Sequence, residues 1–281
     1  AWAAGDMLAR GFLLGGTAGR TTLNGEGLQH QDGHSHLQAA LIPNCISYDP
    51  TFAYELAVII QEGLRRMYVK QENVFYYVTV MNENYAHPAM PEGAEEGIVK
   101  GMYLLREVES GKWEVGKPAV QLLGSGTILR EVIAAAELLE KDFGVASDIW
   151  SVTSFNELRR DGLDCERWNM LHPDMPRRAS YVEQCLAGRG GPVIAATDYV
   201  KSYADQIRPY IPGRYKVLGT DGFGRSDTRE KLRRFFEVNR FYIALAALKA
   251  LADEGAIQTG EVSKAIRLYR IDPDKPNPAT V

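Results

Sequence analysis

Cysteine is scarce in this sequence of 281 residues, which contains only Cys45, Cys165 and Cys185. The three are odd in number and lack the close spacing of zinc ligands, so neither a disulfide framework nor a cysteine-based zinc site is expected. Reduced thiols in a cytoplasm are the interpretation that remains, with small buried apolar side chains as their ordinary structural role.

Long apolar runs and a positive net charge are also missing. The longest apolar runs, such as residues 243–248, are far shorter than the about 20 residues that a membrane-spanning helix needs, and no secretion-signal pattern opens the chain. The net charge is −4, and the basic residues are scattered except for short pairs at 65–66 and 233–234. We therefore expect no membrane partner and no nucleic-acid partner.

The composition is that of an ordinary globular protein, because 45% of the residues are apolar and 24% are charged. Short β-branched or apolar runs alternate with amphipathic stretches, which predicts an α/β fold with a mainly parallel sheet. The predicted strands are 41–47, 73–80, 119–123, 149–152, 193–196 and 216–219, and the predicted helices are 2–16, 52–67, 127–143, 156–171, 199–211, 229–236, 240–254 and 261–269.

A polar segment at 82–97, N-E-N-Y-A-H-P-A-M-P-E-G-A-E-E-G, separates two such α/β patterns. Pro88 and Pro91 fix their φ angles and provide no backbone donor, so this segment is expected to cross between two domains in an extended form.

The stretch 21–38, T-T-L-N-G-E-G-L-Q-H-Q-D-G-H-S-H-L-Q, has the composition of a site loop. It contains His30, His34 and His36, three of the five histidines, together with Glu26, Asp32 and several glycines. Glycine lets the backbone approach a ligand closely, while His and carboxylate side chains transfer protons near neutral pH. We expect neither a helix nor a strand here.

The residues of this stretch alone leave three interpretations open. His30, His34 and His36 could be metal ligands, the loop could face an organic cofactor or substrate, or the histidines could simply cap neighbouring elements of a solvated turn.

Longer blocks of sequence carry a more specific resemblance. They are R-T-T-L-N-G-E-G-L-Q-H-Q-D-G-H-S-H from Arg20, I-P-N-C-I-S-Y-D-P from Ile42, M-N-E-N-Y from Met81, M-P-E-G-A-E-E-G-I from Met90, L-L-G-S-G-T-I-L-R from Leu122, S-D-I-W-S-V-T-S-F from Ser147, D-C-E-R-W-N-M-L-H-P from Asp164 and L-G-T-D-G-F-G-R-S-D from Leu218. In this order, over nearly the whole chain, they resemble the homodimeric bacterial pyruvate dehydrogenases, the thiamine-diphosphate-dependent first component of a multienzyme complex.

The resemblance implies a fold and a domain division. Residues 1–88 would be the C-terminal half of a pyrimidine-binding thiamine-enzyme domain, and residues 89–281 a transketolase-like C-terminal domain. Members of this family are much longer, so the earlier part of the first domain is expected to lie in polypeptide upstream of this sequence.

The resemblance also implies chemistry. In such cytoplasmic enzymes, which act after glycolysis, pyruvate is decarboxylated and its two-carbon fragment passes to the lipoyl domain of a dihydrolipoyl acetyltransferase. Glu26 and His30 would line the active centre as acid/base or orienting residues, and Asp32, His34 and His36 would be second-rank pocket residues.

Thiamine diphosphate and magnesium would be held largely by the upstream segments, so this chain alone is expected to be inactive. The alternative is a non-catalytic module for dimerisation or assembly of the same complex. One further motif stays open: Gly124-Ser125-Gly126, between a strand and a helix, could bind an anion on free N–H groups, but it lacks the spacing of a phosphate-binding loop.

Overall fold

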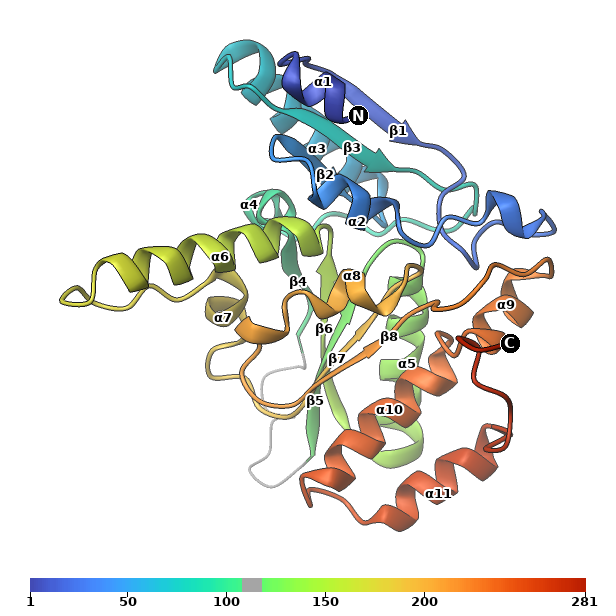
Figure 1. Cartoon of the computed structure of the whole chain (residues 1–281). Helices are drawn as coiled ribbons and strands as arrows, with labels where there is room; N and C mark the ends of the chain where they lie inside the picture. Colours follow the sequence, from blue (N-terminus) through green and yellow to red (C-terminus); the bar gives the residue numbers. More distant parts are fainter. Residues whose placement is uncertain (108–117) are drawn as a thin grey trace.

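The computed structural model describes residues 1–107 and 118–281, which form two α/β units that lie one above the other (Figure 1). The smaller unit contains a three-stranded sheet in the order β1-β3-β2, in which both strand pairs are parallel. Its elements are α1 (Trp2–Asp6), β1 (Phe12–Gly15), the 3-10 helix η1 (Leu28–His30), α2 (Ser35–Ala40), β2 (Cys45–Tyr48), α3 (Ala53–Leu64), the π-helical turn η2 (Arg65–Val69) and β3 (Phe75–Thr79).

The larger unit contains a five-stranded sheet in the order β4-β6-β5-β7-β8, in which only β4 is antiparallel to its neighbour. Its elements are α4 (Ala94–Lys100), β4 (Met102–Arg106), β5 (Ala119–Gly124), α5 (Ile128–Phe143), β6 (Ala146–Val152), α6 (Phe155–Leu171), α7 (Tyr181–Leu186), β7 (Val193–Ala196), α8 (Lys201–Asp205), the 3-10 helix η3 (Arg208–Tyr210), β8 (Tyr215–Leu218), α9 (Arg229–Phe235), α10 (Arg240–Asp253) and α11 (Thr259–Leu268).

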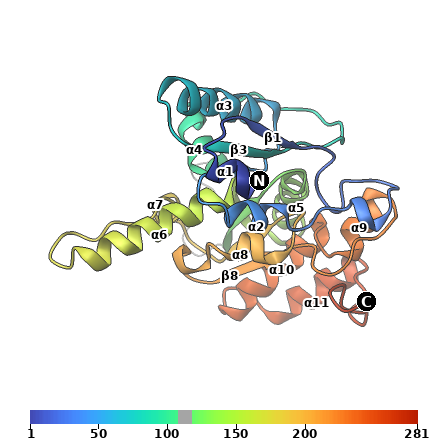
Figure 2. The same cartoon turned by 45° about the horizontal axis from the view of Figure 1, so that its top comes forward.

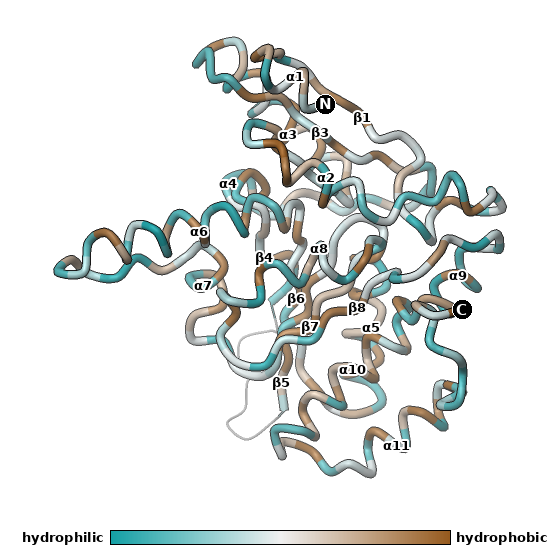
Figure 3. The backbone as a smooth tube through the Cα atoms, in the orientation of Figure 1, coloured by the Kyte–Doolittle hydropathy of each residue, from teal (hydrophilic) through white to brown (hydrophobic). Residues whose placement is uncertain are grey.

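The larger sheet is covered by helices on both faces, and alternate strand residues point to each face. On β5, Leu122 packs in the core formed with α5 and α10, whereas Leu123 packs in the core formed with α6, α7 and α8. On β6, Ile149 packs in the first of these cores and Trp150 in the second. Because both faces are buried, β7 is apolar throughout and residues 119–123 of β5 are apolar except for Gln121; brown segments appear along both strands in Figure 3.

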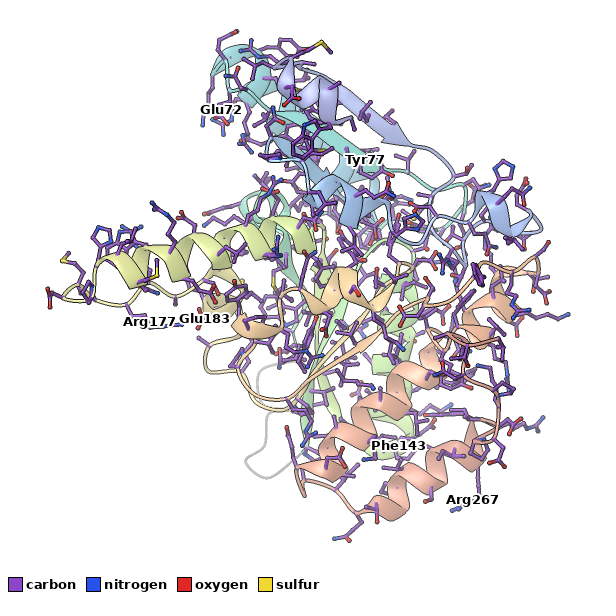
Figure 4. All side chains as sticks on the ribbon, viewed as in Figure 1. Glu72, Tyr77, Phe143, Arg177, Glu183 and Arg267 are labelled. Carbon is purple, nitrogen blue, oxygen red and sulfur yellow. The ribbon has the colours of Figure 1, made fainter. Side chains whose placement is uncertain are left out.

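Helix α6 begins where the Ser154 hydroxyl accepts a hydrogen bond from the backbone N–H of Glu157 at 3.0 Å. The helix then projects beyond the rest of the molecule in both views (Figures 1 and 2). The chain that returns from its end is tied to α7 by an ion pair between Arg177 and Glu183 at 2.6 Å, two side chains that Figure 4 labels beside this helix.

The two units are joined by buried polar contacts. The Glu55 carboxylate accepts hydrogen bonds from Tyr103 at 2.7 Å and Ser151 at 2.6 Å in the larger unit, and from the backbone N–H of Phe52 at 3.0 Å in its own unit. The backbone N–H of Asp49 donates to the carbonyl oxygen of Thr153 at 2.7 Å. Strand β2 itself also meets the larger unit, because the Ser154 hydroxyl donates to the carbonyl oxygen of Ser47 at 2.6 Å.

Most predicted strands and helices are present, but two predictions about the first forty residues are wrong. Residues 2–16 do not form one helix, because α1 ends at Asp6 and residues 12–15 pair with β3 as strand β1. The stretch 21–38 contains η1 and the start of α2, although neither helix nor strand was expected there. Helix α2 forms because the Asp32 carboxylate accepts hydrogen bonds from the backbone N–H groups of His34 and Ser35, both at 3.0 Å.

The other expectations about fold class are met: the chain is α/β, and its sheets are mostly parallel. Within residues 1–107 and 118–281, no helix has the length and apolarity required to cross a membrane.

Candidate functional site

The segment from Thr21 to Gly33 lies along the larger unit and carries Glu26 and His30. Figures 1 and 2 show η1 beside the chain that leads into α9, far from it in sequence. The backbone N–H of Gly25 donates to the carbonyl oxygen of Asp227 at 3.1 Å, and the backbone N–H of Arg229 donates to the Asn24 side chain at 3.1 Å. We call residues 21–33 the site segment.

The beginning of the site segment is fixed by Asp198, which is 2% exposed and follows the carboxyl end of β7. One carboxylate oxygen of Asp198 accepts hydrogen bonds from the N–H (2.9 Å) and hydroxyl (2.7 Å) of Thr21. The other accepts from the N–H (3.2 Å) and hydroxyl (2.7 Å) of Thr22. Burial raises the pKa of Asp198, while Arg233 and these hydrogen bonds act in the opposite direction.

The end of the site segment is fixed by its backbone. The N–H of Val200 donates to the carbonyl oxygen of Gly33 at 2.8 Å, and the Asp32 carboxylate is engaged with the first turn of α2. Gln31 is 6% exposed, and its side chain accepts a hydrogen bond from the Arg225 N–H at 2.7 Å and donates to the Arg225 carbonyl oxygen at 2.5 Å.

Between these fixed ends, the side chains of Glu26 and His30 are exposed. The five residues predicted for the site therefore separate into groups with different surroundings. Glu26, His30 and His34 are exposed, Asp32 is half-buried and bound to α2, and His36 is fully buried. His34 lines a groove of about 400 Å³ together with residues of α2, α6 and the α8 region.

His36 packs as an aromatic side chain inside the protein, between α2 and the larger unit. Its ring is stacked on Tyr203 and meets Tyr199 edge-on, with both pairs of ring centroids 4.7 Å apart. Its Nε2 lies 3.2 Å from the Thr79 hydroxyl. Burial lowers the pKa of His36 to about 3, so the imidazole is neutral at physiological pH.

The Thr79 hydroxyl donates in turn to the Asp49 carboxylate at 2.7 Å, which extends the chain of buried polar groups from His36. Asp49 is 1% exposed, and burial raises its pKa to about 7. The N–H of Gly126 donates to the Asp49 carbonyl oxygen at 3.2 Å, and a Cβ at residue 126 would lie 2.6 Å from the Asp49 carboxylate.

These contacts argue against anion binding at the Gly124-Ser125-Gly126 turn. The N–H of Ser125 donates to Ala196 and that of Gly126 to Asp49, so both are already used by carbonyl oxygens of the fold. The Asp49 carboxylate beside the turn would repel an anion whenever it is ionised. The turn serves to reverse the chain.

The histidine spacing does not produce a metal site. Among the residues of 1–107 and 118–281, no group of three or more His, Cys, Asp or Glu side chains could hold a metal ion. His30 and His34 are exposed, while His36 is buried among tyrosines. The described part of the chain therefore offers no donor set for zinc or for magnesium.

Sequence reasoning did not single out Asp49 and Asp198. Their positions in the sequence could have indicated them. Asp49 directly follows β2, and Asp198 lies two residues after the end of β7. In α/β sheets, ligand-binding residues gather at the carboxyl ends of parallel strands.

Comparisons with known proteins place this geometry in a family. The model of the pyruvate dehydrogenase E1 component middle domain matches residues 1–88, and that of the transketolase-like TK C-terminal domain matches residues 101–239. A pyruvate dehydrogenase E1 component from Cupriavidus necator is 67% identical over 280 residues, and one from Pseudomonas aeruginosa is 68% identical over 279 residues. These matches cover 100% and 99% of this chain, but in each case 31% of the relative.

Solved structures agree on the fold. Transketolase from Campylobacter jejuni matches with a TM-score of 0.65 and 16% identity over 88% of this chain and 33% of that chain. Transketolase from Leishmania mexicana matches with a TM-score of 0.58 and 15% identity over 93% of this chain and 31% of that chain. The resemblance expected from the sequence blocks is confirmed: the chain belongs to the pyruvate dehydrogenase E1 component family, with the transketolase-like α/β fold.

Proposed function

We propose that this chain is part of a thiamine-diphosphate-dependent pyruvate dehydrogenase (acetyl-transferring), in which the site segment faces the reacting centre. The observation that carries the proposal is the 67% identity over 280 residues to a pyruvate dehydrogenase E1 component. The exposed positions of Glu26 and His30, on a segment fixed at both ends, support it, because reacting groups must be accessible and held in place.

Thiamine diphosphate, when bound, would supply the chemistry for decarboxylation of a 2-keto acid. For the residues of this chain, we assign His30 as the hydrogen-bond donor to the keto oxygen of the substrate, since an imidazole N–H suits an oxygen on which negative charge develops. Glu26 is assigned as the acid/base group that accepts or returns a proton at the same centre.

The diphosphate and the magnesium ion do not fit the described residues of this chain. The Gly124-Ser125-Gly126 turn has its N–H groups engaged, and the described residues contain no group of ligands for a metal. Because the chain covers 31% of its relatives, we propose that cofactor and magnesium are held largely by segments upstream of these residues.

The remaining assignments follow from the same proposal. The chain divides into a partial pyrimidine-binding domain at 1–88 and a C-terminal domain at 89–281, acts in the cytoplasm as a homodimer, and passes the acetyl group to a lipoyl domain of the complex. Of the second-rank residues, His34 is the one that is free to meet substrate, because Asp32 caps α2 and His36 is buried.

A graft tests the proposal. The matching 31% of the Cupriavidus necator relative is replaced by this chain, and pyruvate-dependent reduction of an artificial electron acceptor is measured with thiamine diphosphate and magnesium. We expect an active graft, and an activity lower by roughly 100-fold in its Glu26→Gln and His30→Ala variants. His172→Ala, which changes an exposed histidine at the end of α6, is the matched control and should leave the rate unchanged.

An inactive graft that folds and dimerises like the relative would argue against the proposed function. Near-normal rates in both site variants would remove Glu26 and His30 from the mechanism while leaving the family assignment intact.

A further inference from the structure

The site segment makes its most concentrated contact with one side chain of the larger unit. The Asp198 carboxylate accepts all four of the hydrogen bonds described above from Thr21 and Thr22, two neighbouring residues that are themselves 0% exposed. Glu26 follows only four residues later. A charge-assisted set of hydrogen bonds to both oxygens fixes the direction in which the chain leaves this point.

The surroundings of Asp198 leave little freedom for another arrangement. A Cβ at residue 19 would lie 2.4 Å from the Asp198 carboxylate, and Gly19 has a φ of +90°, so glycine is needed both for the space and for the backbone conformation. The Thr22 hydroxyl also lies 2.6 Å from that of Thr127, immediately before α5.

The opposite side of this contact is basic. Arg233, which is 6% exposed, directs its Nε to the Thr21 hydroxyl at 3.4 Å and its guanidinium to the Glu83 carboxylate. The backbone N–H of Arg20 donates to the Asp198 carbonyl oxygen at 3.3 Å. Arg233 thus links Thr21 of the site segment to Glu83.

We propose that Asp198 is a positioning residue, whose buried carboxylate, through Thr21 and Thr22, sets the place of Glu26 and His30 at the reacting centre. The inference rests on the proposed function for its catalytic consequence, but its structural part concerns this chain alone. Asp198 acts from the C-terminal unit, which gives that unit a direct influence on the site.

Asp198→Asn tests the inference, because asparagine keeps the size of the side chain but turns one acceptor into an NH₂ group that faces donors. The matched control is Asp205→Asn, on α8 of the same unit, where the carboxylate is exposed and pairs with Arg208. The first measurement is backbone amide hydrogen exchange on the 281-residue chain. In Asp198→Asn we expect exchange at residues 21–31 to be about tenfold faster, with little change in the strands of the larger sheet.

The second measurement is kinetic and uses the graft described above. We expect Asp198→Asn to lower kcat by about tenfold with little change in KM, and to have no further effect when Glu26→Gln and His30→Ala are both present, since residues that act through one another are not additive. The control should match the parent enzyme in both measurements.

Two results would overturn the inference. One is exchange at residues 21–31 that is unchanged, or that rises only in proportion to a loss of stability throughout the chain. The other is a full further loss of kcat when Asp198→Asn is added to the Glu26→Gln and His30→Ala double variant, which would assign Asp198 a role independent of both groups. An inactive graft would count against the proposed function, and the exchange measurement would still decide the position of the site segment.

Discussion

The rings of His36 and Tyr203 are stacked at an angle of 15°, so α2 of the smaller unit is held against α8 of the larger one by an imidazole that behaves as an aromatic side chain. His36 lies in the stretch 21–38 that was predicted to form the site, yet the side chains around it keep it away from solvent and from substrate. Burial therefore favours its neutral state, and protonation of His36 should lower the stability of the fold.

His36→Phe should reduce the sensitivity of stability to acid. The pKa of His36 is about 3 in the folded protein and 6.5 for an exposed histidine, so between these values the unfolded chain binds the additional proton. Above pH 6.5 His36 does not affect the free energy of unfolding through its protonation. As the pH falls below 6.5, this free energy decreases, by at most about 1.4 kcal/mol for each pH unit. Thermal unfolding between pH 4 and 7 checks this, with His172→Phe as the control. Parallel curves for wild type and His36→Phe would contradict the prediction.

Asp49→Asn should act in the opposite direction. Burial raises the pKa of Asp49 from 3.8 to about 7, so the folded protein holds the additional proton in this window. The associated stability is fully present below pH 3.8 and is lost as the pH rises through 7. We expect Asp49→Asn to be more stable relative to wild type at pH 8 than at pH 5. A difference in unfolding free energy that does not depend on pH would show that Asp49 ionises normally.

The contrast between α5 and the site segment shows what the sequence could predict. Helix α5 and the strand at 193–196 were found because apolar periodicity and flanking glycines are local signals. The pairing of β1 with β3 joins residues far apart in the chain, and so do the bonds from Thr21 to Asp198, which are 177 residues apart. No local pattern contains such contacts, so a helix was predicted at 2–16 and Asp198 was missed.

The same limit applies to individual site residues. Asp32 and His36 both lie in the stretch 21–38, but Asp32 caps α2 and His36 is enclosed by tyrosines. Sequence composition identifies a segment, whereas the direction of each side chain depends on the unit against which the segment packs.

Glu55→Ala should strongly destabilise the chain. The carboxylate is 0% exposed and accepts hydrogen bonds from Tyr103 and Ser151 across the junction of the two units. Its removal leaves buried donors without an acceptor, for which a loss of about 3 kcal/mol in unfolding free energy is expected. Glu55→Gln should cost less, because its amide oxygen still accepts. Urea unfolding measures both, with Glu96→Ala, whose side chain is 76% exposed and pairs with Lys100, as a control of little effect.

The isolated chain should neither bind thiamine diphosphate tightly nor decarboxylate pyruvate. Its described residues offer no magnesium site, and the glycine-rich turn at 124–126 has its N–H groups engaged, so the charged end of the cofactor lacks partners here. Calorimetric titration with thiamine diphosphate and magnesium should show no binding at micromolar concentration, and carbon dioxide release from pyruvate should stay at the uncatalysed rate. The graft into the longer relative is the positive control. Cofactor-dependent release of carbon dioxide by the 281-residue chain alone would mean that the cofactor is held by residues of this chain after all, and the assignment of that role to upstream segments would fail.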